Sequence, residues 1–291
     1  YFLRGFNLDH GSDFATSVNG MPVNNVSHAH GQGYMDLNFL MPELLSTVRY
    51  RKGTYSAEDG DFAVTGSARI DYVRRLADPI VDLTVGEHQH RRLLGAASRT
   101  LANDLILLGA IELGGTDGPW EQPERLRKVN TFLRLSSGTP DNGFSVTGMT
   151  YRSHWIATEH VPERAISSGE IGRYGSLAST DGGRTYRNSL SGQWTRSGDQ
   201  GSTQASAYGV GYGLNLFSSP SGLLDPQHEQ EDRRTILGGS VSHNWDLGAA
   251  WRDSNVTLGL QVRQDRIPRV GLFNTVRRVR TDTVRQDKLT E

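Results

Sequence analysis

Hydrophobic and polar residues alternate strictly in several segments of the second half of the chain. Between residues 255 and 263, apolar side chains occupy every second position and polar residues or glycine occupy the others. A period of two places the apolar side chains on one face of a β-strand and the polar ones on the other. The apolar positions are Val256, Leu258, Leu260 and Val262. Successive strands of this kind are typical of an antiparallel barrel in a membrane, where one face contacts lipid and the other faces a lumen.

The same pattern predicts about ten strands after residue 79, several longer than the roughly 9 to 11 residues that a tilted strand needs to cross a membrane. The predicted strands are Ile80–His88, His90–Leu101, Asp104–Leu113, Leu126–Ser137, Gly143–His154, Arg184–Ser197, Ser202–Ser218, Asp232–Leu247, Asp253–Arg266 and Leu272–Leu289.

The predicted connections are alternately short and long. Alternate connections of an up-and-down barrel lie on the same rim, so the order predicts one rim of short turns and one rim of long loops. A soluble sandwich has no reason to keep that order. The short connections are Ala102–Asn103, Gly138–Asn142 and Gly198–Gly201, and the long ones are Gly114–Arg125, Trp155–Gly183 and Ser219–Glu231.

Residues 1–76 have a different pattern and predict a separate, compact α+β segment before a wall of residues 77–291. Strands are expected at Phe14–Val18, Thr47–Lys52 and Ala68–Val73, with a tight turn at Asn19-Gly20. Asp36 is the expected N-cap of a short helix that extends to Leu45, although Pro42 limits its regularity.

Composition changes this picture little. The net charge is −1, which gives no reason to expect a nucleic-acid partner, and the absence of cysteine excludes disulfides and thiolate metal sites. The mean hydropathy is −0.51, and no run reaches the roughly 18 to 20 apolar residues of a membrane helix. Both ends fall inside patterned segments, so we expect a piece of a longer protein. The tryptophans fall near strand ends, which fits either an interfacial girdle or ordinary core positions: Trp120, Trp155, Trp194, Trp245 and Trp251.

Ordered motifs in residues 1–75 resemble the plug domain of TonB-dependent outer-membrane receptors. An Arg-Gly-Phe element precedes a strand and a turn in which Asn19 stands where the family usually has Asp. A later strand and turn end at Gly53, with Thr54 where the family usually has proline. The residues that carry the resemblance are Arg4, Gly5, Phe6, Asn19, Gly20, Pro22, Arg51, Gly53, Gly60 and Gly66.

The resemblance implies a transmembrane barrel of about 22 strands in the outer membrane of a Gram-negative bacterium, closed by its N-terminal plug. This chain would hold the later part of the plug and the first strands of the wall. The expected partners are a TonB-type energy-coupling complex, outer-membrane lipid and lipopolysaccharide, and a small-molecule substrate. A ferric siderophore is the first expectation, followed by cobalamin, carbohydrates or other metal chelates. The resemblance implies no covalent chemistry and no cofactor.

Polar residues of two plug loops are the candidate substrate-binding set at the plug apex. Two histidines at positions i and i+2 of an extended segment share a face and are candidate metal ligands. No third ligand has a fixed spacing, so hydrogen bonding within a polar loop is the favoured interpretation. The candidate residues are Asn7, Asp9, His10, His28, His30, Gln32 and Tyr34.

Three charged groups carry further expectations. Arg69, Asp71, Arg74, Arg75 and Asp78 are expected to form ion pairs between plug and wall. The run that contains Glu229, Glu231, Asp232, Arg233 and Arg234 is interpreted as a solvated loop base in preference to a surface that faces lipopolysaccharide. Asp181-Gly182-Gly183 is interpreted as a turn, and His88 and His90 as residues of an exposed strand connection.

Two alternative functions remain open from the residues alone. A passive outer-membrane porin or adhesin barrel would lack a folded plug. A soluble β-rich hydrolase that uses the His28 and His30 pair with a metal would be water-soluble and would contain bound metal, whereas a transporter would require detergent.

Overall fold

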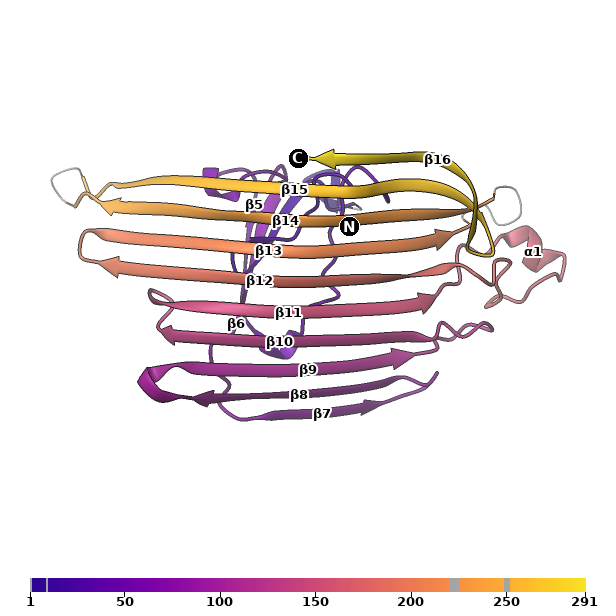
Figure 1. Ribbon diagram of the computed structural model, residues 1–291, viewed down its shortest axis with the longest axis horizontal. Helices are drawn as coiled ribbons and strands as arrows, with labels where there is room; N and C mark the ends of the chain where they lie inside the picture. Colours follow the sequence, from indigo (N-terminus) through magenta and orange to yellow (C-terminus); the bar gives the residue numbers. More distant parts are fainter. Residues whose placement is uncertain (1, 9, 220–225, 249–251) are drawn as a thin grey trace.

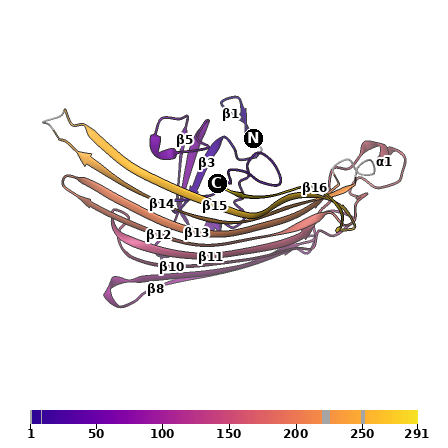
Figure 2. The same ribbon diagram turned by 45° about the horizontal axis from the view of Figure 1, so that its top comes forward.

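The computed structural model describes residues 2–8, 10–219, 226–248 and 252–291. It contains one large antiparallel sheet, called the wall, and an N-terminal plug segment that ends at Tyr72 (Figure 1). The wall strands bend around the plug segment, which lies against one face of the sheet (Figure 2). The predicted fold class, a partial all-β barrel with an N-terminal plug, is confirmed.

The wall is a single sheet of ten strands in sequence order, with β7 and β16 at its two edges. Every neighbouring pair is antiparallel. The strands are β7 (Ile80–Val85), β8 (Arg91–Thr100), β9 (Ile106–Thr116), β10 (Leu126–Gly138), β11 (Asn142–Ile156), β12 (Gly182–Gly198), β13 (Gly201–Ser218), β14 (Gln227–Asp246), β15 (Asn255–Val276) and β16 (Val279–Thr290).

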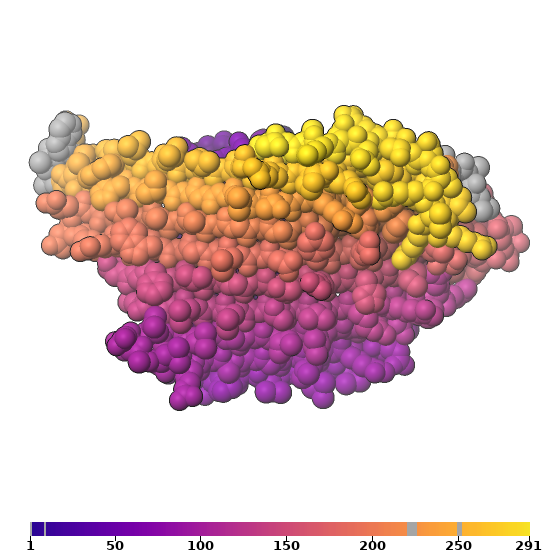
Figure 3. Space-filling model, viewed as in Figure 1, coloured from indigo at the N-terminus to yellow at the C-terminus, as the bar shows by residue number. Residues whose placement is uncertain are grey.

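The alternation of the sequence separates the two faces of the wall. Apolar side chains such as Leu190 and Leu258 are 61% and 70% exposed on the outer face, which Figure 3 shows in space-filling form. On the other face, called the plug-facing face, Gln261 and Arg263 donate hydrogen bonds to backbone carbonyls of the plug segment. The predicted alternation between residues 255 and 263 is therefore confirmed.

The connections form two rims. The long connection 157–181, which contains α1 (Glu163–Ser167), lies at one end of the strands, and the short turns 139–141 and 199–200 lie at the other (Figure 1). The predicted order breaks at the last two connections, because β14 and β15 are joined by residues 247–254 on the short rim, while Arg277-Arg278 alone joins β15 to β16 on the long rim. The predicted strand Leu272–Leu289 is therefore wrong, since it contains this turn. Both turn residues have positive φ, 51° and 66°, without the usual Gly or Asn signal.

The charged run after residue 228 is part of β14 and not a solvated loop base, which corrects the interpretation from sequence. Glu229, Glu231, Asp232 and Arg234 are buried within the sheet. Their charges are compatible with burial because arginines on both faces of the sheet pair with the carboxylates.

The predicted turn at Asp181-Gly182-Gly183 is wrong, because Gly182 and Gly183 are the first residues of β12, and Asp181 before them is fully buried. Its carboxylate accepts hydrogen bonds from the Ser219 backbone N–H at 2.8 Å and from the Gln227 side chain at 2.6 Å. The Arg278 guanidinium donates to the backbone carbonyls of Thr180 and Asp181. Contacts to the carboxylate of Asp181 and to its backbone thereby join three connections of the long rim.

Some tryptophans lie where an interfacial girdle is expected, and others pack inside the protein. Trp194 and Trp245 lie on the outer face near the short rim, as an interfacial girdle would. Trp155 packs instead against the buried cluster around Val210 and Tyr212 on the plug-facing face. Trp120 lies in the connection 117–125, and Trp251 lies outside the described residues.

The plug segment is a small mixed sheet with strand order β4-β3-β6-β5, in which β3 and β6 are parallel. The Asn19-Gly20 turn is confirmed, with φ of 47° and 72° between β3 and β4. The strands are β1 (Phe2–Leu3), β2 (Phe6–Asn7), β3 (Phe14–Val18), β4 (Met21–Pro22), β5 (Leu45–Lys52) and β6 (Gly66–Tyr72).

The predicted helix between Asp36 and Leu45 is wrong. Asp36 Oδ1 accepts a hydrogen bond from the backbone N–H of Asn38, which closes a local turn. Only a 3-10 turn, η1 (Pro42–Leu44), follows it. The other 3-10 turns are η2 (Ala57–Asp59) and η3 (Ala102–Asp104).

No helix among the described residues is long and apolar enough to cross a membrane.

One hydrophobic core joins the plug segment to the wall. Phe39, Leu44 and Tyr72 of the plug segment share it with Leu108 and Phe132 of the wall. The rings of Tyr72 and Phe132 meet edge to face with centroids 4.8 Å apart. Burial of apolar surface thus holds the plug segment on the wall.

We expect Leu108→Ala to weaken the seating of the plug segment by roughly 2–5 kcal/mol, because Leu108 is fully buried in the shared core. Urea titration followed by hydrogen exchange of the plug amides would measure the change. Leu133→Ala is the matched control, since Leu133 is 56% exposed on the outer face. Equal effects of the two substitutions would contradict a shared core.

Candidate functional site

The loop 24–34 of the plug segment contains most of the predicted substrate-binding residues. Asn24 fixes its start: Oδ1 accepts from the Thr16 backbone N–H at 2.7 Å, and Nδ2 donates to the carbonyl of Gly11 at 2.6 Å. Asn25 and Tyr34 then pair as an antiparallel bridge. The loop is therefore a closed structure that brings its polar side chains to defined positions.

His28 is the buried centre of this loop. Its Nδ1 accepts the backbone N–H of His30 at 3.1 Å, so Nε2 carries the proton and donates to the Tyr212 hydroxyl at 3.1 Å. The ring stacks on Tyr34 with centroids 4.2 Å apart. Both ring nitrogens are in use, which favours the hydrogen-bonding interpretation over a metal ligand.

Burial lowers the pKa of His28 to about 3, although Asp232 nearby opposes the shift. Burial also raises the pKa of the Tyr34 hydroxyl well above its ordinary value. Both side chains are thus neutral near pH 7, and the closed loop presents no charge at its centre.

The other candidate residues lie around this centre. His30 is exposed, and its Nδ1 lies 2.7 Å from Gln230 Oε1 on the wall. The rings of His10 and His30 are 5.6 Å apart, and Gln32 is exposed in the same loop. Asn7 pairs with Phe2 in the separate β1–β2 ribbon, and Asp9 lies outside the described residues. The structure therefore brings together His10, His28, His30 and Tyr34 but does not show Asn7 joining them.

Among the residues that the structure describes, no group of three or more His, Asp or Glu side chains is arranged to hold a metal ion.

Two wall arginines bind the backbone of the loop and form what we call the latch. Arg234 donates to the carbonyl of Ser27 at 2.5 Å, and Arg263 donates to the carbonyl of Asn24 at 2.7 Å. Asp232 accepts the backbone N–H of Ala29 at 3.3 Å. Three backbone groups of the plug segment are thereby held by charged side chains, which form the stronger kind of hydrogen bond.

The charges of the latch are balanced within the wall. Arg234 contacts Asp232 at 2.7 Å and Asp265 at 3.3 Å, and Arg263 contacts Asp265 at 2.7 Å. These four side chains carry two positive and two negative charges. The latch thus needs no charge from the plug segment to remain neutral.

A second set of contacts lies at the other side of the plug segment. Arg134 of β10 is buried and donates to Asn19 Oδ1 at 3.3 Å and to the Tyr72 carbonyl at 3.2 Å. Arg92 of β8 binds both carboxylate oxygens of Glu43 at 2.7 and 2.9 Å. Burial alone would raise the pKa of Glu43, but the hydrogen bonds from Arg92 outweigh it and the pKa lies below its ordinary value.

The expected ion pairs between plug and wall do not form as predicted. Arg69 pairs with Glu58 and Asp59, and Asp71 pairs with Arg49, all within the plug segment. Arg74 does reach the wall, but it donates to the carbonyls of Ser137 and Gly138. No contact of Arg75 or Asp78 with the wall accompanies them in the described structure.

Two glycines of the plug motif lie where neighbouring atoms leave no room for a Cβ. A Cβ on Gly66, where φ is 153°, would lie 2.1 Å from the Arg51 carbonyl oxygen. A Cβ on Gly53 would lie 2.5 Å from the Arg4 guanidinium, which is 3.5 Å from the Tyr55 hydroxyl. The remaining motif residues occupy turns or strands: Gly5, Phe6, Asn19, Gly20, Pro22 and Gly60.

Sequence analysis missed the wall half of the site. Tyr212, Gln230 and Arg263 contact the loop from strands that are 180 or more residues away in sequence. The alternation of each strand could have indicated them, because all three residues occupy positions whose side chains point to the plug-facing face.

Lowering the pH should open the loop 24–34. The unfolded loop binds a proton at His28 with a pKa near 6.5, whereas the closed loop resists protonation down to about 3. Stability is therefore full above pH 6.5 and falls as the pH drops from 6.5 toward 3, by about 2 kcal/mol between pH 7 and pH 5. Hydrogen exchange of the loop amides would measure this.

His28→Gln should remove the pH dependence, while His30→Gln, which leaves the buried ring in place, should retain it. Equal protection of the wild-type loop amides at both pH values would contradict the assignment of His28 as a buried neutral side chain.

Comparisons with known proteins agree with this architecture. The family model of the TonB-dependent receptor plug domain matches residues 1–67. No curated protein matches the chain in sequence.

Solved structures resemble the chain over nearly its full length. The ferric citrate transporter FecA in its unliganded form has a TM-score of 0.76 at 11% identity, with 98% of this chain and 43% of that chain covered. The copper transporter OprC has a TM-score of 0.64 at 16% identity, with 95% of this chain and 42% of that chain covered. The outer-membrane receptor FpvA from Pseudomonas aeruginosa PAO1, bound to pyoverdine, has a TM-score of 0.64 at 13% identity, with 98% of this chain and 43% of that chain covered.

The chain thus spans less than half of the length of these structures. Residues 1–67 therefore match the plug domain of TonB-dependent receptors, and the chain as a whole shares the fold of these solved structures, a plug segment seated on a barrel wall.

Proposed function

We propose that the chain belongs to an outer-membrane receptor that captures a ferric siderophore or another metal chelate and imports it by energy-coupled rearrangement of the plug. The observation that carries the proposal is the seating of a matched plug domain on a barrel wall through a latch of releasable contacts. Structurally similar proteins are described as a ferric citrate transporter, a copper transporter and a pyoverdine receptor, which supports this substrate class.

The exposed part of the loop suits a metal chelate better than a bare metal ion. His28 uses both ring nitrogens within the protein. His30 and Gln32 are exposed beside it and carry hydrogen-bonding groups, and Tyr34 adds an aromatic face. Such a surface can donate to the oxygen atoms of a chelate whose own ligands hold the metal.

The latch permits plug movement without separating buried charges. If the loop leaves, Arg234 keeps Asp232 and Asp265, and Arg263 keeps Asp265. At the latch the loop loses hydrogen bonds with three backbone groups, roughly 1.5–3 kcal/mol each, and it also loses the hydrogen bonds of His28 with Tyr212 and of His30 with Gln230. A force applied to the plug by a TonB-type coupling complex would therefore break hydrogen bonds at the loop but separate none of the charged pairs of the latch.

A disulfide between plug and wall tests whether plug movement drives import. A Cβ on Gly20 would lie 3.6 Å from Ser206 Cβ, within the roughly 3.5–4.5 Å of a disulfide, and the chain contains no cysteine. In the full-length receptor, oxidised Gly20→Cys/Ser206→Cys should bind radiolabelled ferric siderophore but not import it. A reductant should restore uptake.

The control is Ser206→Cys/Ser240→Cys, which joins two wall strands whose serine hydroxyls lie 2.8 Å apart. It should import normally when oxidised. Uptake that continues through the oxidised plug–wall disulfide, and without the coupling complex, would overturn the proposal in favour of a passive barrel.

A further inference from the structure

The outer face of the wall carries a band of arginines just above its apolar surface, on the side of the long rim. Arg184 of β12 is two residues from Tyr186, the first of the apolar outer-face residues of that strand, so charge gives way to apolar surface within roughly 7 Å. The strand register places Arg127 and His154 level with Arg184. It places three more arginines level with Tyr186: Arg152, Arg233 and Arg269.

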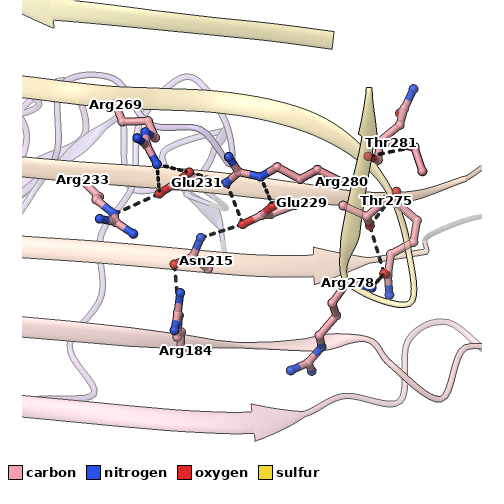
Figure 4. Close-up of polar contacts among 12 residues, drawn as sticks. Arg184, Asn215, Glu229, Glu231, Arg233, Arg269, Thr275, Arg278, Arg280 and Thr281 are labelled. Atoms are coloured by element: carbon pink, nitrogen blue, oxygen red, sulfur yellow. Dashed lines mark hydrogen bonds and ion pairs between the residues drawn. The ribbon is translucent and has the colours of Figure 1, made fainter. Parts of the chain in front are cut away.

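Two buried carboxylates organise one end of this band (Figure 4). Arg280 binds Glu229 and Glu231 together, Arg233 lies 2.9 Å from Glu231, and Arg269 lies 3.3 Å from it. The three guanidinium side chains remain 37–47% exposed. Three positive charges thus surround two negative ones, and an excess of positive charge faces outward.

Asn215 connects this cluster to Arg184. Its Nδ2 donates to Glu229 at 2.7 Å, and its Oδ1 accepts from Arg184 Nε at 3.2 Å (Figure 4). Arg184 therefore has a neutral partner, and its charge is not balanced by this contact.

A pocket of about 420 Å³ lies beside Arg184 at the rim. Two of its basic side chains come from the ends of β11 and β12, one from the connection before β10 and one from the β15–β16 turn, and none of the described lining residues carries a carboxylate. Arg278 is held there by the carbonyls of Thr180 and Asp181, and its guanidinium lies 5.1 Å from the Phe217 ring centroid. The lining includes Arg125, His154, Arg184 and Arg278, with Ile156 and Phe217 as apolar surface.

We infer that this pocket binds the phosphate group of a membrane lipid, with the acyl chains on the apolar outer face below it. Arginine forks match phosphate oxygens, and basic pockets at this depth suit anionic headgroups. The continuity with exposed Tyr186 and Leu190 favours a lipid over free phosphate. The inference rests on the proposed outer-membrane location.

Native mass spectrometry of the full-length receptor in detergent tests the inference, with dioleoyl phosphatidic acid as the probe and phosphatidylcholine as the neutral comparison. Wild type should prefer phosphatidic acid, and Arg125→Gln/Arg184→Gln should lower that preference about tenfold, as the loss of charge-assisted hydrogen bonds predicts. The matched control is Arg99→Gln/Arg196→Gln, which removes the same charge from the exposed outer face near the short rim.

An equal loss in both double variants would overturn the inference in favour of general surface charge. Displacement of the lipid by millimolar inorganic phosphate would overturn it in favour of a free-phosphate site. Heat-modifiable gel mobility confirms that each variant folds. Ferric siderophore binding, measured in the same preparation, tests the proposed function separately. A receptor that prefers phosphatidic acid but does not bind the siderophore contradicts only the proposed substrate class. A receptor that binds the siderophore but has no lipid preference contradicts only the lipid site.

Discussion

The wall is one sheet thick, so each strand must satisfy two different surroundings with alternate side chains. Leu258 and Leu260 are exposed on one face, while Gln261 and Arg263 bind the plug segment from the other. The antiparallel ladder satisfies the backbone groups between strands and leaves only the side chains to distinguish the two faces. The shared core, the latch and the arginine band all follow from which residues this alternation places on which face.

The plug-facing face combines strong contacts with contacts that can be released. Leu108 and Phe132 bury apolar surface against the plug segment, and Arg134 holds the end of β6. At the loop 24–34, in contrast, the ion pairs remain within the wall, and the plug segment is bound through backbone groups and through the neutral side chain of His28. One side of the plug segment is therefore held mainly by buried apolar surface, and the other is held mainly by hydrogen bonds.

The sequence predicts those features that depend on local pattern. The alternating strands and the Asn19-Gly20 turn needed no distant partner, because side-chain period and positive φ are local properties. The helix after Asp36 failed because a side-chain turn competed with it. Sequence alone places Glu229 and Glu231 in a loop because two of the arginines that pair with them, Arg269 and Arg280, are distant in sequence. The partners of His28 could not be predicted for the same reason.

Asp181 has a consequence beyond its own hydrogen bonds. Its carboxylate and backbone join the connection 157–181 to Ser219 at the end of β13, to Gln227 at the start of β14 and to Arg278 in the β15–β16 turn. Opening any one of these connections breaks contacts that the others share, so the long rim should open and close cooperatively rather than loop by loop.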